Sequence, residues 1–160
     1  MMCGAARFSW HDTHDPLLTG ATPIAPTAGE YEARYWAGTP VLPVRDATGG
    51  LALWRWGNRN EVAGLPATGW AQKESIAAGK WHRHHPQFVS IPVTAGYEQG
   101  VWFGITHGIH GIVVADRVFM LTIAADDAYQ AMTHHPRMPW LIDQATIVPM
   151  AGSRQQLGLW

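Results

Sequence analysis

The sequence predicts an α+β fold in which a mainly antiparallel sheet or partial β-barrel is accompanied by a few short helices. Short segments rich in β-branched and aromatic residues recur along the chain, and Gly, Pro or Asp bounds them. Helix signals are fewer, and the segments that carry them are short. The length of 160 residues and the apolar share of 47% suit one domain, residues 1–160, with a single core.

Six segments are candidate strands because each is short and rich in β-branched or aromatic side chains. They are residues 41–45, 51–56, 88–93, 101–106, 111–115 and 118–123. Between residues 21 and 50, Gly, Pro, Thr and Asp dominate except at residues 31–36, which predicts loop with short extended pieces. We expect this stretch to cover the domain rather than to link two domains.

Two helices are predicted. The longer one begins at Asp126, a residue type that commonly caps helix N-termini, and ends near Pro136. The shorter one covers residues 71–78. No segment repeats another, and none is apolar over the length that a membrane span needs.

Charge and cysteine content limit the classes of function. The 11 Lys and Arg against 12 Asp and Glu give a formal net charge of -1, so any contact with nucleic acid must come from a local patch. Nine Trp residues could supply surfaces on which unpaired bases stack. One cysteine cannot form an internal disulfide, and no secretory leader is visible, which predicts a soluble cytoplasmic protein.

Cys3 is the first candidate for chemistry because of its place near the N-terminus. If it became the first residue, its amine and its thiol would share one carbon skeleton. Such a 1,2-aminothiol attacks an aldehyde first through nitrogen, giving an imine, and then through sulfur, closing a thiazolidine ring. A nucleophilic cysteine also needs an acid–base group nearby to move protons.

Glu98 and His135 are candidate acid–base partners. Glu98 ends an apolar segment, where a carboxylate can be partly buried and can shuttle protons. His135 follows the longer predicted helix at a turn limited by proline, and imidazole titrates near neutral pH. Two plainer interpretations stay open: Glu98 as a solvated strand end and His135 as a helix C-cap.

Six short motifs occur along the chain in the order in which one known family carries them. They are Met2-Cys3-Gly4, Ile24-Ala25-Pro26-Thr27, Val44-Arg45, Arg55-Trp56-Gly57, Ile91-Pro92 followed by Tyr97-Glu98, and His135-Pro136-Arg137-Met138-Pro139. With these motifs the chain resembles the SOS-response-associated peptidase family from residue 2 to beyond residue 139. Each motif alone is weak, but six in register are specific.

The resemblance implies a protein of the DNA-damage response that bonds abasic sites in single-stranded DNA, with no cofactor and no metal. Cys3 would be the nucleophile, Glu98 the proton-transfer group and His135 the group that assists imine chemistry. The family is also credited with releasing its own N-terminal residues, hence the name peptidase. We expect a monomer that does not bind membranes. The implied DNA contacts are Arg55, Trp56, Gly57, Lys73, Arg83 and Arg137.

Departures from the family pattern predict a divergent member. The family motif Asn-Ala-Arg-Ala-Glu-Thr, anchored here on Glu74-Ser75, places Trp70 at the Asn position and Gln72 at the Arg position. Lys73 would then replace the lost positive charge. Gln99 stands where an aromatic residue usually follows Tyr-Glu.

The start of the chain also departs from the pattern. Ala5 replaces the Arg that usually follows Cys-Gly, and Arg7 comes two positions later. Met1 followed by Met2 would not be trimmed in the ordinary way. We therefore expect Cys3 to become the first residue through translation from Met2 or through self-cleavage.

Alternatives from other classes of function stay open. The histidines at 82–85, 107–110 and 134–135 match no known zinc pattern, so a metal site is the weaker hypothesis. Cys3, His135 and Glu98 could instead form a cysteine hydrolase for peptide or amide bonds, which would turn over. The missing family Asn also fits a binding-only descendant that has lost reactivity.

Overall fold

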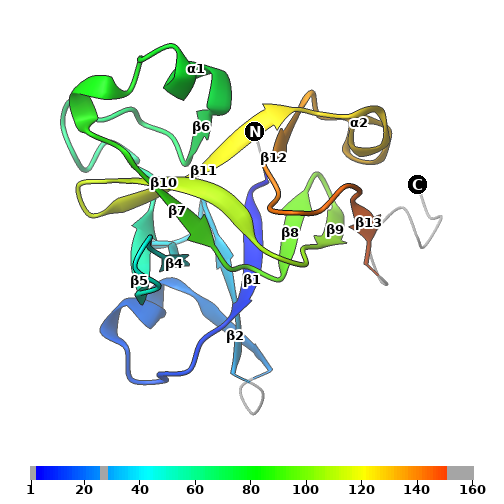
Figure 1. Ribbon diagram of the computed structural model, residues 1–160. Helices are drawn as coiled ribbons and strands as arrows, with labels where there is room; N and C mark the ends of the chain where they lie inside the picture. The colour runs from blue at the N-terminus through cyan, green and yellow to red at the C-terminus, as the bar shows by residue number, and fades with distance from the viewer. Residues whose placement is uncertain (1–2, 26–28, 151–160) are drawn as a thin grey trace.

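The chain forms two β-sheets and two short α-helices in a computed structural model that describes residues 3–25 and 29–150 (Figure 1). One sheet is antiparallel, and the other closes into a five-stranded barrel. The predicted α+β class, with a dominant sheet or partial barrel, is confirmed. No helix of the described residues is long and apolar enough to cross a membrane.

The barrel consists of β4 (Val41–Arg45), β5 (Leu51–Trp56), β7 (Gln87–Ile91), β10 (Ile109–Val114) and β11 (Arg117–Ala124). These strands follow the order β10-β7-β4-β5-β11, and β10 also pairs with β11, which closes the ring. Two short strands, β6 (Trp70–Gln72) and β12 (Arg137–Pro139), pair with the second half of β11. β11 is buried from residue 117 to residue 122, as expected for a strand covered on both faces.

The second sheet has the order β13-β9-β8-β1-β3-β2. Its strands are β1 (Ala5–Ser9), β2 (Thr22–Ala25), β3 (Glu30–Arg34), β8 (Ala95–Glu98), β9 (Val101–Gly104) and β13 (Val148–Pro149). β1 lies in the middle and pairs with β3 on one side and β8 on the other. This central position brings the N-terminal end of β1 into the interior, next to the end of β8.

Residues 21–50 do more than cover the domain. β2 and β3 complete the second sheet, and β4 is part of the barrel. In β3, Tyr31 and Ala33 are buried while the charged Glu30 and Arg34 are exposed. This alternation is the period-two pattern of a strand with one buried face.

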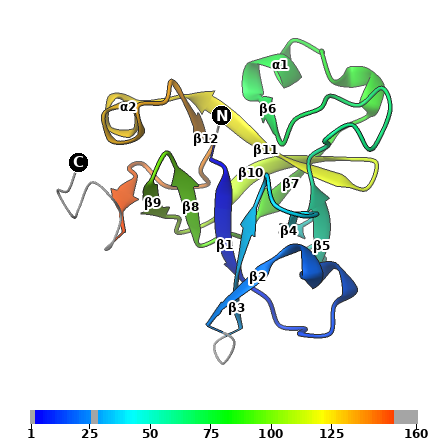
Figure 2. The same cartoon turned by 180° about the vertical axis from the view of Figure 1, so that it is seen from behind.

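α2 (Asp127–Thr133) matches the longer predicted helix. The Asp126 side chain accepts a hydrogen bond from the Tyr129 backbone N–H at 2.7 Å, which is a standard N-cap. The helix ends at His134, whose φ of 58° is left-handed, two residues before Pro136. Figures 1 and 2 show α2 next to β12, on the side of the molecule where the N-terminal end of β1 lies.

The shorter helix, α1 (Lys73–Ala77), follows β6 directly. Two 3₁₀ segments, η1 (Pro16–Gly20) and η3 (His82–His84), complete the regular structure of the described residues. A small apolar cluster that includes Trp81, Phe119 and Leu121 packs below α1. The larger cluster joins the two sheets to α2, and Cys3 is one of its members.

Candidate active site

Cys3 lies directly before β1 and is only 1% exposed. Its backbone is held from two sides, since Gly4 N–H donates to the Tyr97 oxygen at 2.9 Å and Trp70 Nε1 donates to the Cys3 oxygen at 3.3 Å. The thiol donates to the Ala5 carbonyl oxygen, with an Sγ–O distance of 3.3 Å. Burial raises the pKa of the Cys3 thiol to about 12, so the sulfur is protonated at neutral pH.

Gly96 in β8 provides the space that the sulfur occupies. A Cβ atom on residue 96 would lie 2.9 Å from Cys3 Sγ and 2.7 Å from the Phe103 ring. Neither neighbour can withdraw easily, because both belong to the packed larger cluster. β8 therefore supplies the gap for the sulfur and, two residues later, Glu98.

Glu98 is the last residue of β8 and is 1% exposed. Its Oε1 has no hydrogen-bond partner among the described residues. Burial raises the pKa of Glu98 to about 7, because the charged form loses its hydration. Glu98 also adds to the effect of burial in raising the pKa of Cys3, which places the two groups within reach of each other's charge. A carboxyl that titrates near neutral pH can both give and take a proton.

His135 lies at the turn between α2 and β12 and is largely buried. Arg137 N–H donates to His135 Nδ1 at 3.1 Å, and the backbone N–H of His135 donates to Thr133 Oγ1 at 3.3 Å. Burial lowers the pKa of His135, which favours the neutral ring at pH 7. Tyr129 and Met132 of α2 pack in the same cluster as Cys3, so the turn that carries His135 is anchored on that cluster.

A cavity of about 230 Å³ opens beside Glu98. It is smaller than the roughly 300–1,000 Å³ of sites for drug-sized ligands, so it suits a group the size of one sugar. At its mouth, Trp36 is 60% exposed and the Arg34 guanidinium carbon lies 5.8 Å from the centre of the Tyr97 ring. The lining residues are Gly4, Ala5, Arg34, Trp36, Ala37, Tyr97, Glu98 and Gln99.

Trp56 and Gly57, predicted to contact DNA, lie inside the molecule. Trp56 is 2% exposed, its Nε1 donates to the Gly69 oxygen at 3.1 Å, and its ring packs edge-on against Tyr35 at 5.3 Å. Gly57 has a φ of 67°, and a Cβ there would meet neighbouring backbone at 2.5 Å. The face of Trp56 is therefore closed to a stacking base in this conformation. Trp36, which packs on the same Tyr35 at 4.7 Å, is exposed instead.

Arg137 is engaged in a network within the protein. Its guanidinium forms two hydrogen bonds to the Glu74 carboxylate, at 2.9 and 2.8 Å, and a third to the Thr122 carbonyl oxygen at 2.9 Å. The hydrogen bonds from Arg137 hold the pKa of Glu74 down at about 2. This bidentate pair ties β12 to α1, so Arg137 serves the fold whether or not it meets DNA.

Of the other predicted DNA contacts, Lys73 adjoins Glu74, the partner of Arg137, whereas Arg55 and Arg83 belong to other elements. Arg55 lies in β5 and Arg83 in η3, so with Arg137 in β12 the three arginines belong to three separate elements. Lys73 lies at the start of α1, with its Nζ 4.2 Å from the centre of the Trp140 ring. The basic side chain that lines the same cavity as Glu98 is Arg34.

Sequence analysis missed Arg34, Trp36 and Tyr129. Arg34 ends β3 and Trp36 lies in the turn after it, so no strand periodicity in the sequence indicated that both line one cavity. Tyr129 gave no signal either, since a tyrosine in an amphipathic helix is ordinarily a core residue. Among residues 3–25 and 29–150, no group of three or more His, Cys, Asp or Glu side chains could hold a metal ion.

Comparisons with family models, with curated proteins and with solved structures find no match for this chain. The resemblance to the SOS-response-associated peptidase family therefore stays a prediction from its motifs. Within these motifs, Met2, Pro26 and Thr27 lie outside the described residues, as does Met1.

Proposed function

We propose that this chain captures abasic sites in single-stranded DNA by bonding their aldehyde to Cys3, after releasing the residues that precede Cys3. The observation that carries the proposal is that the Cys3 thiol lies within electrostatic reach of Glu98, a carboxyl of pKa about 7 that lines a sugar-sized cavity. Release of the leader hydrolyses one peptide bond and frees the Cys3 amine. We propose that the protein acts as a monomer in the cytoplasm.

The mouth of the cavity supports an unpaired strand as the partner. Trp36 offers an exposed indole face, and every base has a π-face that can stack on it. Arg34 can add a phosphate contact, although it also pairs with Glu32 at 2.6 Å. A duplex base pair would present neither an unstacked base nor an accessible sugar carbon to so small a cavity.

The chemistry would proceed in two additions at the sugar aldehyde. The Cys3 amine attacks the aldehyde carbon, the oxygen takes a proton from the Glu98 carboxyl, and the nitrogen gives a proton back to the Glu98 carboxylate, which leaves a neutral carbinolamine. Loss of water, assisted by His135 and Glu98, leaves an imine. The sulfur then bonds to the imine carbon, the π electrons pass to nitrogen, and the thiol proton reaches that nitrogen through Glu98. The products are one thiazolidine ring and one water, with no change in oxidation state.

The ionisation of Cys3 argues against the hydrolase alternative. A cysteine hydrolase keeps a thiolate next to an imidazolium. Here burial raises the pKa of Cys3 to about 12 and lowers the pKa of His135, and both shifts oppose that ion pair. Capture that starts from the amine needs no resting thiolate.

A single-stranded oligonucleotide with one abasic site tests the proposal. We expect an adduct that survives denaturation, while Cys3→Ser and an undamaged strand give none. Intact mass of the protein reports whether Cys3 is the first residue before reaction. An adduct that persists in Cys3→Ser would refute the role of the sulfur, and binding without any adduct would favour the binding-only alternative.

A further inference from the structure

Tyr129 carries a fully buried hydroxyl. The residue is 0% exposed, and its ring packs edge-on against Phe103 with 5.6 Å between the ring centres. Among the described residues the hydroxyl oxygen makes no hydrogen bond of normal geometry, and the Thr133 side chain acts on it only by lowering its pKa against the larger effect of burial. Buried polar groups are nearly always paired, and a phenylalanine would fill the same space without the unpaired hydroxyl. Packing therefore explains the ring of Tyr129 but not its oxygen.

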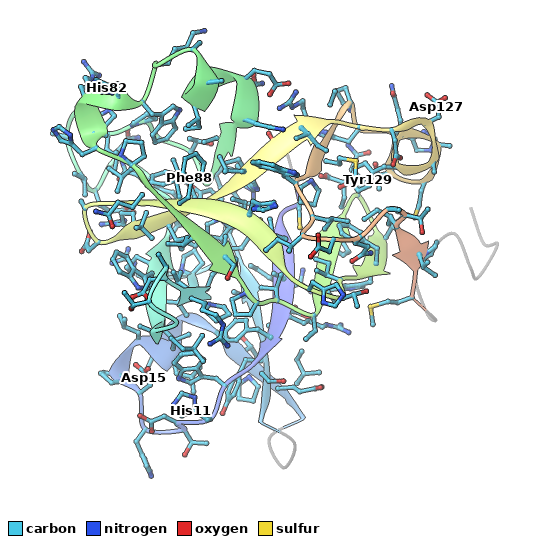
Figure 3. All side chains as sticks on the ribbon, in the orientation of Figure 1. His11, Asp15, His82, Phe88, Asp127 and Tyr129 are labelled. Atoms are coloured by element: carbon cyan, nitrogen blue, oxygen red, sulfur yellow. The ribbon has the colours of Figure 1, made fainter. Side chains whose placement is uncertain are left out.

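The hydroxyl lies at the reactive end of the molecule. Figure 3 shows Tyr129 on the side of α2 that faces the sheets, whereas Asp127 lies on the outer side. Phe103, which contacts the Tyr129 ring, also borders Gly96, the residue that faces Cys3 Sγ. Burial raises the pKa of Tyr129, and the negative charges of Cys3 and Glu98 raise it further. The phenol is thus within electrostatic reach of both reacting groups.

The sulfur of Cys3 needs a donor that the resting structure only partly provides. Its thiol donates to the Ala5 carbonyl oxygen, a group that cannot stabilise an anion. Backbone groups of Tyr97 and Ala5 lower the thiol pKa but do not offset burial, which holds it at about 12. A buried anion without further donors is strongly disfavoured. A neutral phenol that keeps its proton at every working pH is a suitable additional donor.

We propose that Tyr129 is a positioning residue whose hydroxyl donates a hydrogen bond to the Cys3 sulfur as negative charge develops there. The inference deepens the function proposed above, and for abasic sites it rests on that function. In the ring-closing step, the Glu98 carboxylate takes the thiol proton and the sulfur electron pair forms the bond to the imine carbon. The imine π electrons move to nitrogen, which recovers the proton from Glu98. Tyr129 keeps its own proton throughout and lowers the energy of the anion.

The ionisation of the thiol can be tested without DNA. The chain has one cysteine, so alkylation by iodoacetamide, followed by intact mass between pH 7 and pH 10, reports on Cys3 alone. We expect Tyr129→Phe to react about tenfold more slowly at each pH. Losing the hydroxyl donor should raise the pKa of the Cys3 thiol by about one unit, which lowers the thiolate fraction by the same factor. Its unfolding midpoint should equal or exceed that of the parent, because an unpaired hydroxyl has been removed. Tyr31→Phe, in the buried face of β3, is the matched control and should react at the parent rate.

The following outcomes decide the inference. Alkylation of Tyr129→Phe at the parent rate, or an equal loss in Tyr31→Phe, overturns it. Should Tyr129→Phe fail to fold, 3-fluorotyrosine can replace tyrosine, because fluorine makes the hydroxyl a stronger hydrogen-bond donor. Faster alkylation of this protein supports the inference, and an unchanged rate overturns it. The parent protein could form no adduct with abasic DNA while Tyr129→Phe still slows alkylation. This result would refute the proposed function but support the role of Tyr129 inferred here.

Discussion

Trp70 and Cys3, 67 residues apart, are joined by a hydrogen bond from the indole Nε1 to the Cys3 carbonyl oxygen. Trp70 stands at the position where the resembled family has Asn, and indole and amide share the ability to donate from nitrogen. The ring also packs 4.7 Å from the centre of Tyr35 and 6.0 Å from that of Trp56. The backbone of Cys3, the proposed nucleophile, is thereby fixed to the aromatic cluster that ends at the exposed Trp36.

Trp70→Phe separates the hydrogen bond from the packing. Removing the donor while keeping an aromatic ring should lower the free energy of unfolding by about 0.5–1.5 kcal/mol and slow adduct formation, since Cys3 is held less firmly. Trp70→Asn is the complementary variant, because it keeps a donor and loses the ring. We expect Trp70→Asn to be less stable than Trp70→Phe. Its rate of adduct formation per folded molecule should nevertheless be higher than that of Trp70→Phe. Urea unfolding and single-turnover adduct formation measure the two effects, and equal rates for parent and Trp70→Phe would contradict the role of the bond.

Gly96→Ala should displace the sulfur. The added methyl would lie 2.9 Å from Cys3 Sγ, so overpacking of about 1–3 kcal/mol is expected together with a loss of adduct formation. Gly104→Ala in neighbouring β9 is the matched control, because a Cβ there meets nothing within 4 Å. In a Cys3→Ala background the penalty at residue 96 should shrink, although the contact with Phe103 remains. A full penalty in that background, seen by urea unfolding, would show that the sulfur is not the limiting neighbour.

The sequence predicted the barrel better than the second sheet. Residues 41–45 and 51–56 form strands at the predicted bounds, and the other four candidates match β7, β9, β10 and β11 to within a few residues. These strands are apolar and flanked by turn residues, so local pattern suffices. β1 was missed because Ala5 and Ala6 are weak strand formers, and they are strand residues only through pairing with β3 and β8.

Some residues of the candidate site could be predicted from the sequence and others could not. Cys3 and Glu98, predicted from separate motifs, share one buried location because β1 and β8 pair side by side. The DNA contacts were harder to predict, because exposure depends on tertiary packing. Trp56 and Trp36 look alike in sequence, yet the first is 2% exposed and the second 60%. Tyr35 packs against both rings, and the two differ in position: Trp56 ends β5 of the barrel, whereas Trp36 lies in the turn after β3.

Glu98 makes stability depend on pH in a direction opposite to that of most carboxylates. Burial raises its pKa in the fold from 4.5 to about 7. Between these pH values the folded state binds more protons than the unfolded state, so stability falls as pH rises and levels off above about pH 7. The full effect is on the order of 3 kcal/mol. Glu98→Gln cannot titrate and should lack this loss, which makes it more stable than the parent at pH 8.

The same variant should separate proton transfer from binding. The glutamine side chain keeps the shape of the glutamic acid but cannot give up a proton, so adduct formation should slow by a factor on the order of a hundred or more. Affinity for undamaged single-stranded DNA should stay near that of the parent. In the parent, the rate of adduct formation should fall as pH rises through about 7, because the first step uses the protonated carboxyl as its acid.

Glu30→Gln, an exposed change at the start of β3, controls for the loss of one charge. Urea unfolding at pH 5 and pH 8, with adduct rates under saturating protein, provides the measurement. A Glu98→Gln variant that reacts at the parent rate, with the parent's pH dependence, would remove Glu98 from the chemistry and leave it a buried structural acid.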